Sequence, residues 1–381
     1  MKTRVTIEDF RSEISTSDGC IALGELSVRA NVSFTPKVLR ANNKEFALTD
    51  AARPLVSEQP CWPAAAMKSL LPLLFCSGFA IADFVRPLVI WHGLGDSHSS
   101  PGMLQFKSLI EEMHPGIFVH SVYIEDDLDK DRQAGFYGNV NNQVEFVASQ
   151  LDSIPELQGG FDAIGLSQGG QFLRAYVERY NYPPVNNLIT FGSQHMGISD
   201  IPPCGRYDFL CQVARRAAKQ GAYSEWAQEN LIQAQYYRDP ANLEAYLEAN
   251  YFLPDINNEL PTDRNTTYAS NLASLDKLVL VLFTEDKTVV PKESAWFGAE
   301  EVDEDAIYSE DIIQKVFKLG LLERAVIPMR LQPIYLEDWI GLRKLDERGS
   351  IVFETCKGEH MQMSDCWEDI VANFVGGTVT G

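Results

Sequence analysis

Three features that would indicate other functions are missing from this sequence: an excess of positive charge, a long apolar run and an internal repeat. The 381 residues carry 53 Asp and Glu against 32 Lys and Arg, a formal net charge of −21. Such a charge disfavours binding to nucleic acid and gives no attraction to an anionic membrane surface. No apolar run reaches the length of a membrane-spanning helix, so no stable membrane insertion is expected. The charge favours solubility, and 45% hydrophobic residues suffice for one large α/β domain or two small ones.

Metal-binding signatures are missing as well. Beyond residue 82 the chain has four cysteines, which form two close pairs, Cys204 with Cys211 and Cys356 with Cys366. Their spacing is not C-x-x-C and no histidine pair accompanies them, so the pattern favours disulfides over a zinc site. We therefore predict neither a metal nor a cofactor.

The N-terminal region differs from the remainder of the chain. Residues 1–66 are polar, weakly periodic and without a recognisable motif. Residues 67–82 then combine one lysine, a short apolar run and Ala80-Ile81-Ala82, which is the layout of a secretory signal peptide with its cleavage site. The alternative is a buried core helix. We expect translation to start at Met67, residues 1–66 to be a gene-model extension, and the mature domain to span residues 83–381.

The sequence from Gly165 to Gly169, GLSQG, matches the nucleophile-elbow pattern G-x-S-x-G. In that pattern a serine, here Ser167, lies in a strained turn between a strand and a helix, and the glycines remove side chains that would clash. The context fits, because residues 161–166 are typical of a short buried strand and apolar residues at helical spacing follow. The alternative is a plain strand-to-helix turn.

Further strands and helices alternate around this motif. Apolar runs predict strands at residues 87–91, 117–123, 188–192, 278–283 and 351–355. Helices are predicted at residues 103–113, at residues 139–151 and from about Asp365. The predicted fold class is therefore α/β, an α/β-hydrolase fold with a mostly parallel central sheet.

Two segments interrupt this alternation. From about residue 195 to 276 there is no strand signal, and helical spacing appears instead, with Ser224 as a plausible N-cap. An insertion of this kind between core strands predicts a helical lid over the site, although core packing alone would explain most of its apolar residues. A second insertion, at about residues 299–327, begins with an acidic run and is expected to be a solvated surface segment.

The candidate catalytic residues are Ser167, Asp286 and His360. This is the chain order of nucleophile, acid and base in α/β hydrolases, and each residue closely follows a predicted strand. All three would gather at the carboxyl edge of one parallel sheet. His360 would take the serine proton during attack, and Asp286 would hold the imidazole in the correct tautomer. The backbone amides of Leu94 and Gln168 are the candidates for the oxyanion hole.

Other residues of the right type are less well placed. Glu285 lies one residue closer to its strand than Asp286. His92, His114 and His120 precede the elbow, in the wrong part of the chain for the base. His92 also lies in a glycine-flanked loop, which suits a structural role better. A satisfied structural histidine remains the alternative for His360.

Five strings along the chain are VIWHGLGDS at 89–97, GLSQGGQFLRAY at 165–176, GAYSEWAQENLIQAQYYRDP at 221–240, FLPDINNE at 252–259 and WFG at 296–298. They resemble the palmitoyl-protein thioesterase family of lysosomal depalmitoylating enzymes, and the resemblance covers essentially all of the chain from Pro87 onward. The resemblance implies an α/β hydrolase whose lid helps to form a groove for a fatty acyl chain. It also implies that the substrates are S-palmitoylated proteins or peptides and acyl thioesters, in a lysosome or vacuole of the secretory pathway.

The resemblance also implies roles for individual positions. Two departures from the animal enzymes are the acidic insertion after Trp296 and the cysteines around His360. If Cys204 pairs with Cys211, then Cys356 and Cys366 are the only cysteines left in the mature chain, and we predict that they form a second disulfide. The matching positions imply Ser167, Asp286 and His360 as the triad, Leu94 and Gln168 as oxyanion donors, a Cys204–Cys211 disulfide and a glycan on Asn265 of Asn265-Thr266-Thr267.

Two other function classes use the same features. One is a lipase or carboxylesterase that cleaves oxygen esters with the same triad. The other is a non-catalytic lipid-binding protein, against which the complete triad argues.

Overall fold

The computed structural model of the chain describes residues 85–200, 221–302, 324–363 and 366–377. Contacts divide the chain into a unit Met1–Cys76 and a unit Ser77–Gly381, and all described residues belong to the second. The predictions for residues 1–66, for residues 67–82 and for Cys204 and Cys211 lie outside the described residues.

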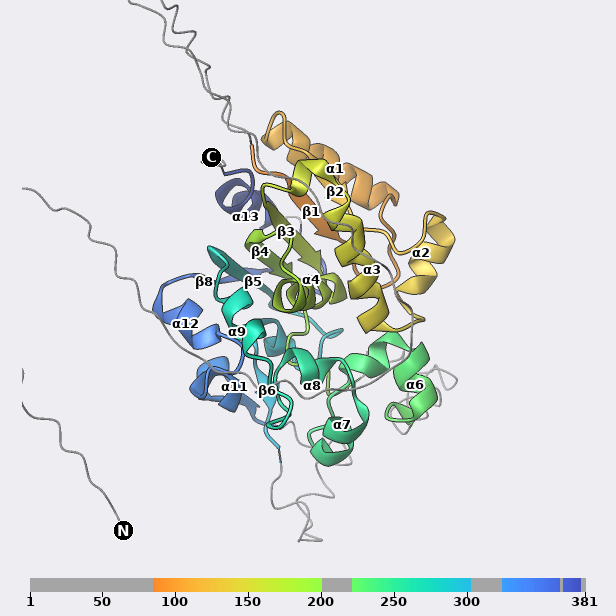
Figure 1. The fold of residues 1–381 in the computed structure, drawn as a ribbon, viewed down its shortest axis with the longest axis vertical. Helices are drawn as coiled ribbons and strands as arrows, with labels where there is room; N and C mark the ends of the chain where they lie inside the picture. The colour runs from red at the N-terminus through yellow and green to blue at the C-terminus, as the bar shows by residue number, and fades with distance from the viewer. Residues whose placement is uncertain (1–84, 201–220, 303–323, 364–365, 378–381) are drawn as a thin grey trace, which may run out of the picture. The chain divides into compact units, whose positions relative to one another are not determined.

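A six-stranded sheet forms the centre of the second unit, and all its strand pairs are parallel. The prediction of a mostly parallel sheet is confirmed. Strands β1 and β5 are almost continuously apolar and buried, because helices cover both faces of the sheet there and leave no polar side for water. In the order β2-β1-β3-β4-β5-β8 they are Val119–Ser121, Leu88–Trp91, Phe161–Leu166, Val185–Phe191, Lys277–Phe283 and Ile351–Cys356 (Figure 1).

Strand order creates a crevice at one point of this sheet. From β1 the chain moves outward to β2, whereas from β3 it moves in the other direction to β4 and β5. In open α/β sheets such a switch point lies between the loops that follow the two central strands, here β1 and β3, and ligands bind there. Both loops carry predicted site residues.

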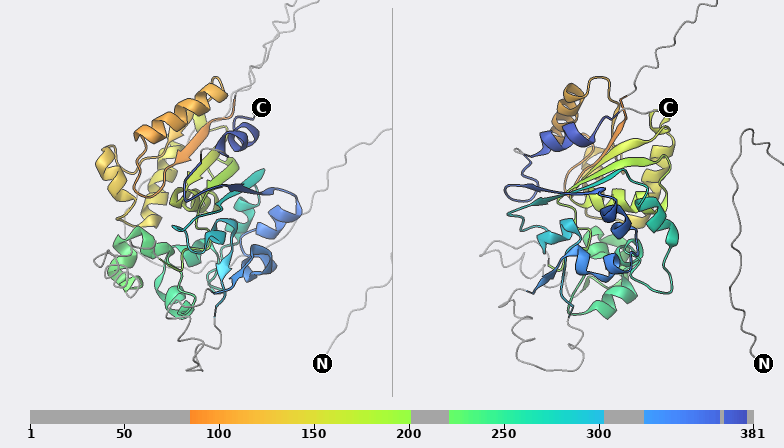
Figure 2. Two further views of the ribbon diagram at one scale, coloured as in Figure 1. Left: turned by 180° about the vertical axis from the view of Figure 1, so that it is seen from behind. Right: turned by 90° about the vertical axis from the view of Figure 1, so that its left-hand side faces the viewer.

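The two faces of the sheet are covered by different helices. Side chains alternate along a strand, so Leu88 and Ile90 point to one face while Val89 and Trp91 point to the other. The first face packs against α1, Pro101–Met113, and α13, Trp367–Phe374. The second packs against α3, Val140–Asp152, and α4, Gln168–Arg179. The right-hand view of Figure 2 shows the sheet edge-on between these two layers.

The segment predicted as a lid is helical where the structure describes it. Ser224 caps α6, Glu225–Asn230, by accepting a hydrogen bond from the amide of Ala227, as predicted. This helix ends at Asn230, because Leu231 is extended and bridges Tyr137. The segment continues through η2 Ile232–Tyr236, α7 Leu243–Ala249, α8 Leu253–Ile256 and α9 Thr266–Leu272.

The second insertion is closed at its base by a short antiparallel pair of strands. Ala299 pairs with Ile327 and Glu300 with Val326. The middle of the insertion lies outside the described residues. None of the helices in the described ranges is long and apolar enough to cross a membrane. The remaining elements are α2 Leu128–Ala134, η1 Pro155–Leu157, η3 Lys292–Trp296, β6 Ala299–Glu300, β7 Val326–Ile327, η5 Met329–Leu331, α11 Pro333–Leu336 and α12 Leu342–Glu347.

Candidate active site

Ser167 occupies a sharp turn between β3 and α4. Its φ of 54° and ψ of −123° lie outside the regions that a residue with a side chain readily adopts. The neighbouring glycines permit this turn by close backbone approach. A Cβ on Gly165 would lie 2.1 Å from the Cα of Gly170, and one on Gly169 would lie 2.3 Å from the carbonyl oxygen of Trp91. The glycines of the motif are thus required where α4 packs against β3 and against the end of β1.

His360 lies between Ser167 and Asp286. Its Nε2 is 3.0 Å from the Ser167 hydroxyl oxygen, and its Nδ1 is 2.6 Å from Oδ2 of Asp286. A carboxylate can only accept, so Nδ1 carries the proton and Nε2 is free to accept the serine proton. The three predicted residues are therefore brought together in hydrogen-bonding order. Glu285 is exposed, and its backbone amide donates to the carbonyl of Gly358 instead.

Asp286 and His360 are each held from a second side. The other carboxylate oxygen of Asp286 accepts hydrogen bonds from the amides of Thr288 and Val289, at 2.8 and 3.0 Å. The Asp286 side chain is 2% exposed, and the imidazole of His360 packs edge-on against Phe283. These contacts leave the imidazole one orientation, toward Ser167.

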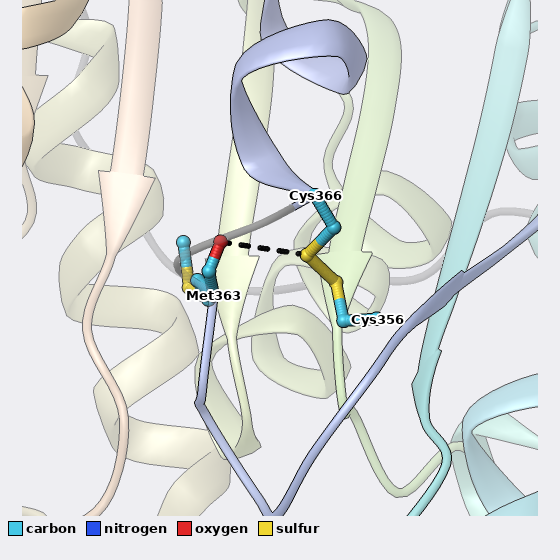
Figure 3. Close-up of a disulfide and its surroundings, with 3 residues drawn as sticks. All are labelled: Cys356, Met363 and Cys366. Atoms are coloured by element: carbon cyan, nitrogen blue, oxygen red, sulfur yellow. Dashed lines mark hydrogen bonds between the residues drawn. A yellow bond between two sulfur atoms is a disulfide. The ribbon is translucent and has the colours of Figure 1, made fainter.

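A disulfide joins the two ends of the segment that carries His360. Cys356 ends β8 and Cys366 precedes α13, ten residues later (Figure 3). The carbonyl oxygen of Met363 lies 3.6 Å from the sulfur of Cys366. The structure thus contains the disulfide predicted around His360, and it closes a small loop whose middle bears the base.

The amides of Leu94 and Gln168 border Ser167 from the crevice between β1 and β3. Within the described residues, neither amide donates to a protein acceptor. The Gln168 side chain is buried and fixed, because its Nε2 donates to the carbonyl of Gly135 and its Oε1 accepts from the hydroxyl of Tyr236. Two free amide donors beside a serine hydroxyl are what an oxyanion hole requires.

A pocket of about 430 Å³ opens in front of these groups. Ser167, His360 and Leu94 line it. The helical insertion contributes further wall residues, among them Ile198, Gln233 and Tyr236. The pocket has the size of a small-molecule site, and its walls combine apolar side chains with a few polar groups.

The other histidines considered from the sequence lie apart from the triad. His92 is buried beside Asp131, His114 caps the C-terminal end of α1, and His120 on β2 contacts Gln150. Asn265 is exposed and caps α9, where its Oδ1 accepts from the amide of Thr267.

One acidic residue next to the site, Asp131, was not predicted from the sequence. Asp131 lies on α2, a helix that was not predicted because its charged sequence LDKDRQA is typical of a solvated surface. Yet the Asp131 side chain is fully buried and contacts both His92 and His98. The sequence itself signals only the capping Asp127, which begins the helix.

Comparison with known proteins agrees with this site. The family described as palmitoyl protein thioesterase matches residues 87–360. Palmitoyl-protein thioesterase 1 of Caenorhabditis elegans is 40% identical over 299 residues, which cover 77% of this chain and 94% of that protein. Palmitoyl-protein thioesterase 3 of Dictyostelium discoideum is 33% identical over 308 residues, covering 80% and 96%. The Lysosomal thioesterase PPT2 homolog of Drosophila melanogaster is 30% identical over 295 residues, covering 75% and 89%. This chain therefore belongs to the palmitoyl protein thioesterase family.

Proposed function

We propose that this chain hydrolyses thioesters between long-chain fatty acids, palmitate above all, and the cysteines of S-acylated proteins or peptides. Its class, a thioester hydrolase, follows from its family. The observation that supports the proposed mechanism is the alignment of Ser167, His360 and Asp286 at 3.0 and 2.6 Å.

The first half-reaction acylates Ser167. Nε2 of His360 removes the hydroxyl proton while the serine oxygen attacks the thioester carbonyl carbon. The carbonyl oxygen becomes an oxyanion and accepts hydrogen bonds from the amides of Leu94 and Gln168. The carbon–sulfur bond then breaks, and the proton on Nε2 of His360 passes to the released thiolate, which leaves Nε2 free to accept a proton again. A cysteine thiol has a pKa of about 8.5, so its thiolate departs with little help from a general acid.

The second half-reaction releases the fatty acid. Water loses a proton to His360 and attacks the acyl-serine carbonyl, and the proton returns to the oxygen of Ser167 as it leaves. Asp286 stays ionised and stabilises the imidazolium in both steps. The acyl chain would extend along the pocket wall that the helical insertion supplies, so that the insertion acts as a lid that binds the acyl chain.

The location that suits this chemistry is a lysosome or vacuole of the secretory pathway, with release from the cell as a further outcome. Several features support it: the signal-like residues 67–82, the exposed Asn265 in a glycan acceptor sequence, and the Cys356–Cys366 disulfide. The relative from Drosophila melanogaster is named a lysosomal thioesterase. Digestion with an endoglycosidase, followed by gel mobility with and without Asn265→Gln, checks the glycan directly.

Hydrolysis of a palmitoyl thioester by the chain and by Ser167→Ala tests the proposal. We expect turnover by the first and almost none by the second. The same assay with an oxygen ester of identical acyl length separates the lipase or carboxylesterase class, which would show the higher kcat/KM on the oxygen ester. Failure of a fluorophosphonate to label Ser167 would instead indicate a non-catalytic lipid-binding protein.

A further inference from the structure

A second Asp–His pair lies directly behind the oxyanion loop, residues 92–98, which connects β1 to α1. Asp131 on α2 is fully buried, and His92 at the start of the loop is 3% exposed. Nε2 of His92 lies 3.3 Å from Oδ2 of Asp131. Buried acids and bases need a partner, and this contact places the His92 ring and the Asp131 carboxylate at ion-pair distance.

Asp131 also contacts the far end of the oxyanion loop. Its Oδ2 accepts from the backbone amide of His98 at 2.8 Å and from the His98 ring at 2.9 Å. Its Oδ1 accepts from the amides of Ile124 and Glu125, at 2.8 and 3.3 Å. Burial alone would raise the pKa of Asp131, but the hydrogen bonds from His92, His98 and Ile124 outweigh it and hold that pKa well below its usual range.

The second nitrogen of His92 contacts the Gly93–Leu94 peptide, whose N–H is the candidate oxyanion donor. Nδ1 lies 3.1 Å from the carbonyl oxygen of Gly93. A peptide group is planar, so the carbonyl of Gly93 and the N–H of Leu94 belong to one rigid unit and point in opposite directions. Fixing the Gly93 oxygen therefore fixes the direction of the Leu94 amide. The amide of Asp96 donates to the same oxygen at 3.3 Å and closes the turn.

We propose that Asp131 is a positioning residue for the reaction: through His92 it orients the Gly93–Leu94 peptide, so that the Leu94 amide points at the developing oxyanion. The carbonyl of Gly93 and the carboxylate of Asp131 both present acceptor oxygens to the ring nitrogens of His92. The inference rests on the oxyanion role of Leu94 in the proposed function.

Asp131→Asn tests it, with Asp129→Asn as the matched control. Asp129 lies on the same helix but is 82% exposed, and within the described residues its carboxylate pairs only with Arg132. Asp129→Asn therefore removes the same charge as Asp131→Asn without changing a contact to the oxyanion loop. We expect Asp131→Asn to lower kcat about 10- to 100-fold, below the cost of deleting an oxyanion donor outright, with KM within about threefold. Asp129→Asn should match the unchanged chain.

A transition-state analogue provides a readout that a general loss of packing would not move. Palmitoyl trifluoromethyl ketone adds to Ser167 as a hemiketal whose oxygen occupies the oxyanion hole. Its inhibition constant should weaken in Asp131→Asn by the same factor as kcat/KM, whereas the dissociation constant of palmitate should stay unchanged. A rise in KM with kcat unchanged, or equal loss of affinity for both ligands, would overturn the inference.

A second pair of variants covers the case in which Asp131→Asn does not fold. His92→Asn keeps a nitrogen donor near the position of Nδ1, whereas His92→Leu, of similar size, has none. The leucine variant should have about tenfold lower kcat than the asparagine variant at similar KM, and equal values would refute the role of the Gly93 contact. If the unchanged chain itself cleaves no thioester, the proposed function fails instead.

Discussion

Two Asp–His pairs lie at the carboxyl edge of the same sheet, and they differ in what the second imidazole nitrogen meets. In the pair Asp286–His360 that nitrogen faces the hydroxyl of Ser167, which can give up a proton. In the pair Asp131–His92 it faces the carbonyl of Gly93, which cannot. The acid and base are the same types, but only the first pair can transfer a proton during a reaction. The group beyond the ring, a proton-donating hydroxyl or a carbonyl, decides whether such a pair takes part in proton transfer or only holds a loop in place.

The loops are also restrained by different means. The segment with His360 is closed by the Cys356–Cys366 disulfide, a covalent link at its ends. The loop with Leu94 is held by the buried carboxylate of Asp131, which bonds to both ends. A covalent closure restricts the unfolded chain as well, whereas the carboxylate acts only once α2 has packed.

The largest loss of activity is expected from variants of the reacting residues Ser167 and His360. Ser167→Ala and His360→Ala should each lower kcat by on the order of 10⁴ or more and leave the fold intact. Because the residues act as one unit, the double variant should be little worse than either single one. Steady-state kinetics with circular dichroism as a folding check measures this, and additive losses would contradict a joint catalytic unit.

Changing the acid of the reacting pair should cost less. Asp286→Asn keeps the shape but favours the wrong imidazole tautomer, at a cost of up to about 10⁴ in kcat. Glu285→Gln is the matched control, since Glu285 is adjacent in sequence and exposed. If Glu285→Gln, and not Asp286→Asn, caused the large loss of kcat, the assignment of Asp286 as the acid would be wrong.

The disulfide is expected to contribute to stability more than to chemistry. Cys356→Ser with Cys366→Ser opens a loop of about ten residues and should lower the free energy of unfolding by about 2 to 3 kcal/mol in the chain-entropy model. His360 keeps its contacts with Asp286 and Phe283, so kcat should fall about tenfold or less. Urea unfolding and kinetics on the same samples separate the two effects. A loss of kcat as large as that of His360→Ala would mean that the disulfide alone positions the base.

A further buried acid, Glu178, shows how the number of hydrogen bonds determines the pKa of a buried carboxyl group. Glu178 on α4 is fully buried, and among the residues that the structure describes only its Oε1 has a hydrogen-bond partner, the Arg174 guanidinium at 2.9 Å. Burial raises the pKa of Glu178 to about 7, against the opposing charge of Arg174. Asp131, with five nitrogen atoms around it, has its pKa lowered instead.

This difference predicts a pH dependence of stability. Between its ordinary pKa of 4.5 and about 7, Glu178 binds more proton in the folded chain than in the unfolded one. Stability should therefore rise as the pH falls through this window, by on the order of 1 kcal/mol. Burial also raises the pKa of Asp162, to about 6, which acts in the same direction. Urea midpoints at pH 5 and 7.5 test this, and Glu178→Gln should flatten the dependence. A less stable chain at pH 5 would contradict it.

The sequence predicted the parts of the molecule that depend on local pattern. Apolar runs such as residues 278–283 located the strands, and G-x-S-x-G located the turn at Ser167. The triad followed because each member comes just after a strand, and strand ends share one edge in a parallel sheet. The strand at residues 188–192 was found, but it begins three residues earlier, at Val185, because Asn186 and Asn187 mask the apolar pattern.

Long-range packing determined what the sequence could not predict. The helix at residues 225–230 stops where Leu231 bridges Tyr137, a contact between segments far apart in the chain. The burial of Asp131 depends on α2 meeting the loop after β1, and nothing in the charged sequence around it signals this. Likewise, the closure of the acidic insertion by β6 and β7 pairs Ala299 with Ile327 across residues that show no strand pattern.

The most direct test of the account is to observe the acyl-enzyme. The chain would be mixed with a palmitoyl thioester, quenched with acid during turnover, digested and examined by mass spectrometry. We expect a palmitoyl group on Ser167, and none in Ser167→Ala. Thioester turnover that persists in Ser167→Ala, or an acyl group on a different residue, would contradict the assignment of Ser167 as the nucleophile. It would also contradict the assignment of proton transfer to the pair Asp286–His360 and of loop positioning to the pair Asp131–His92.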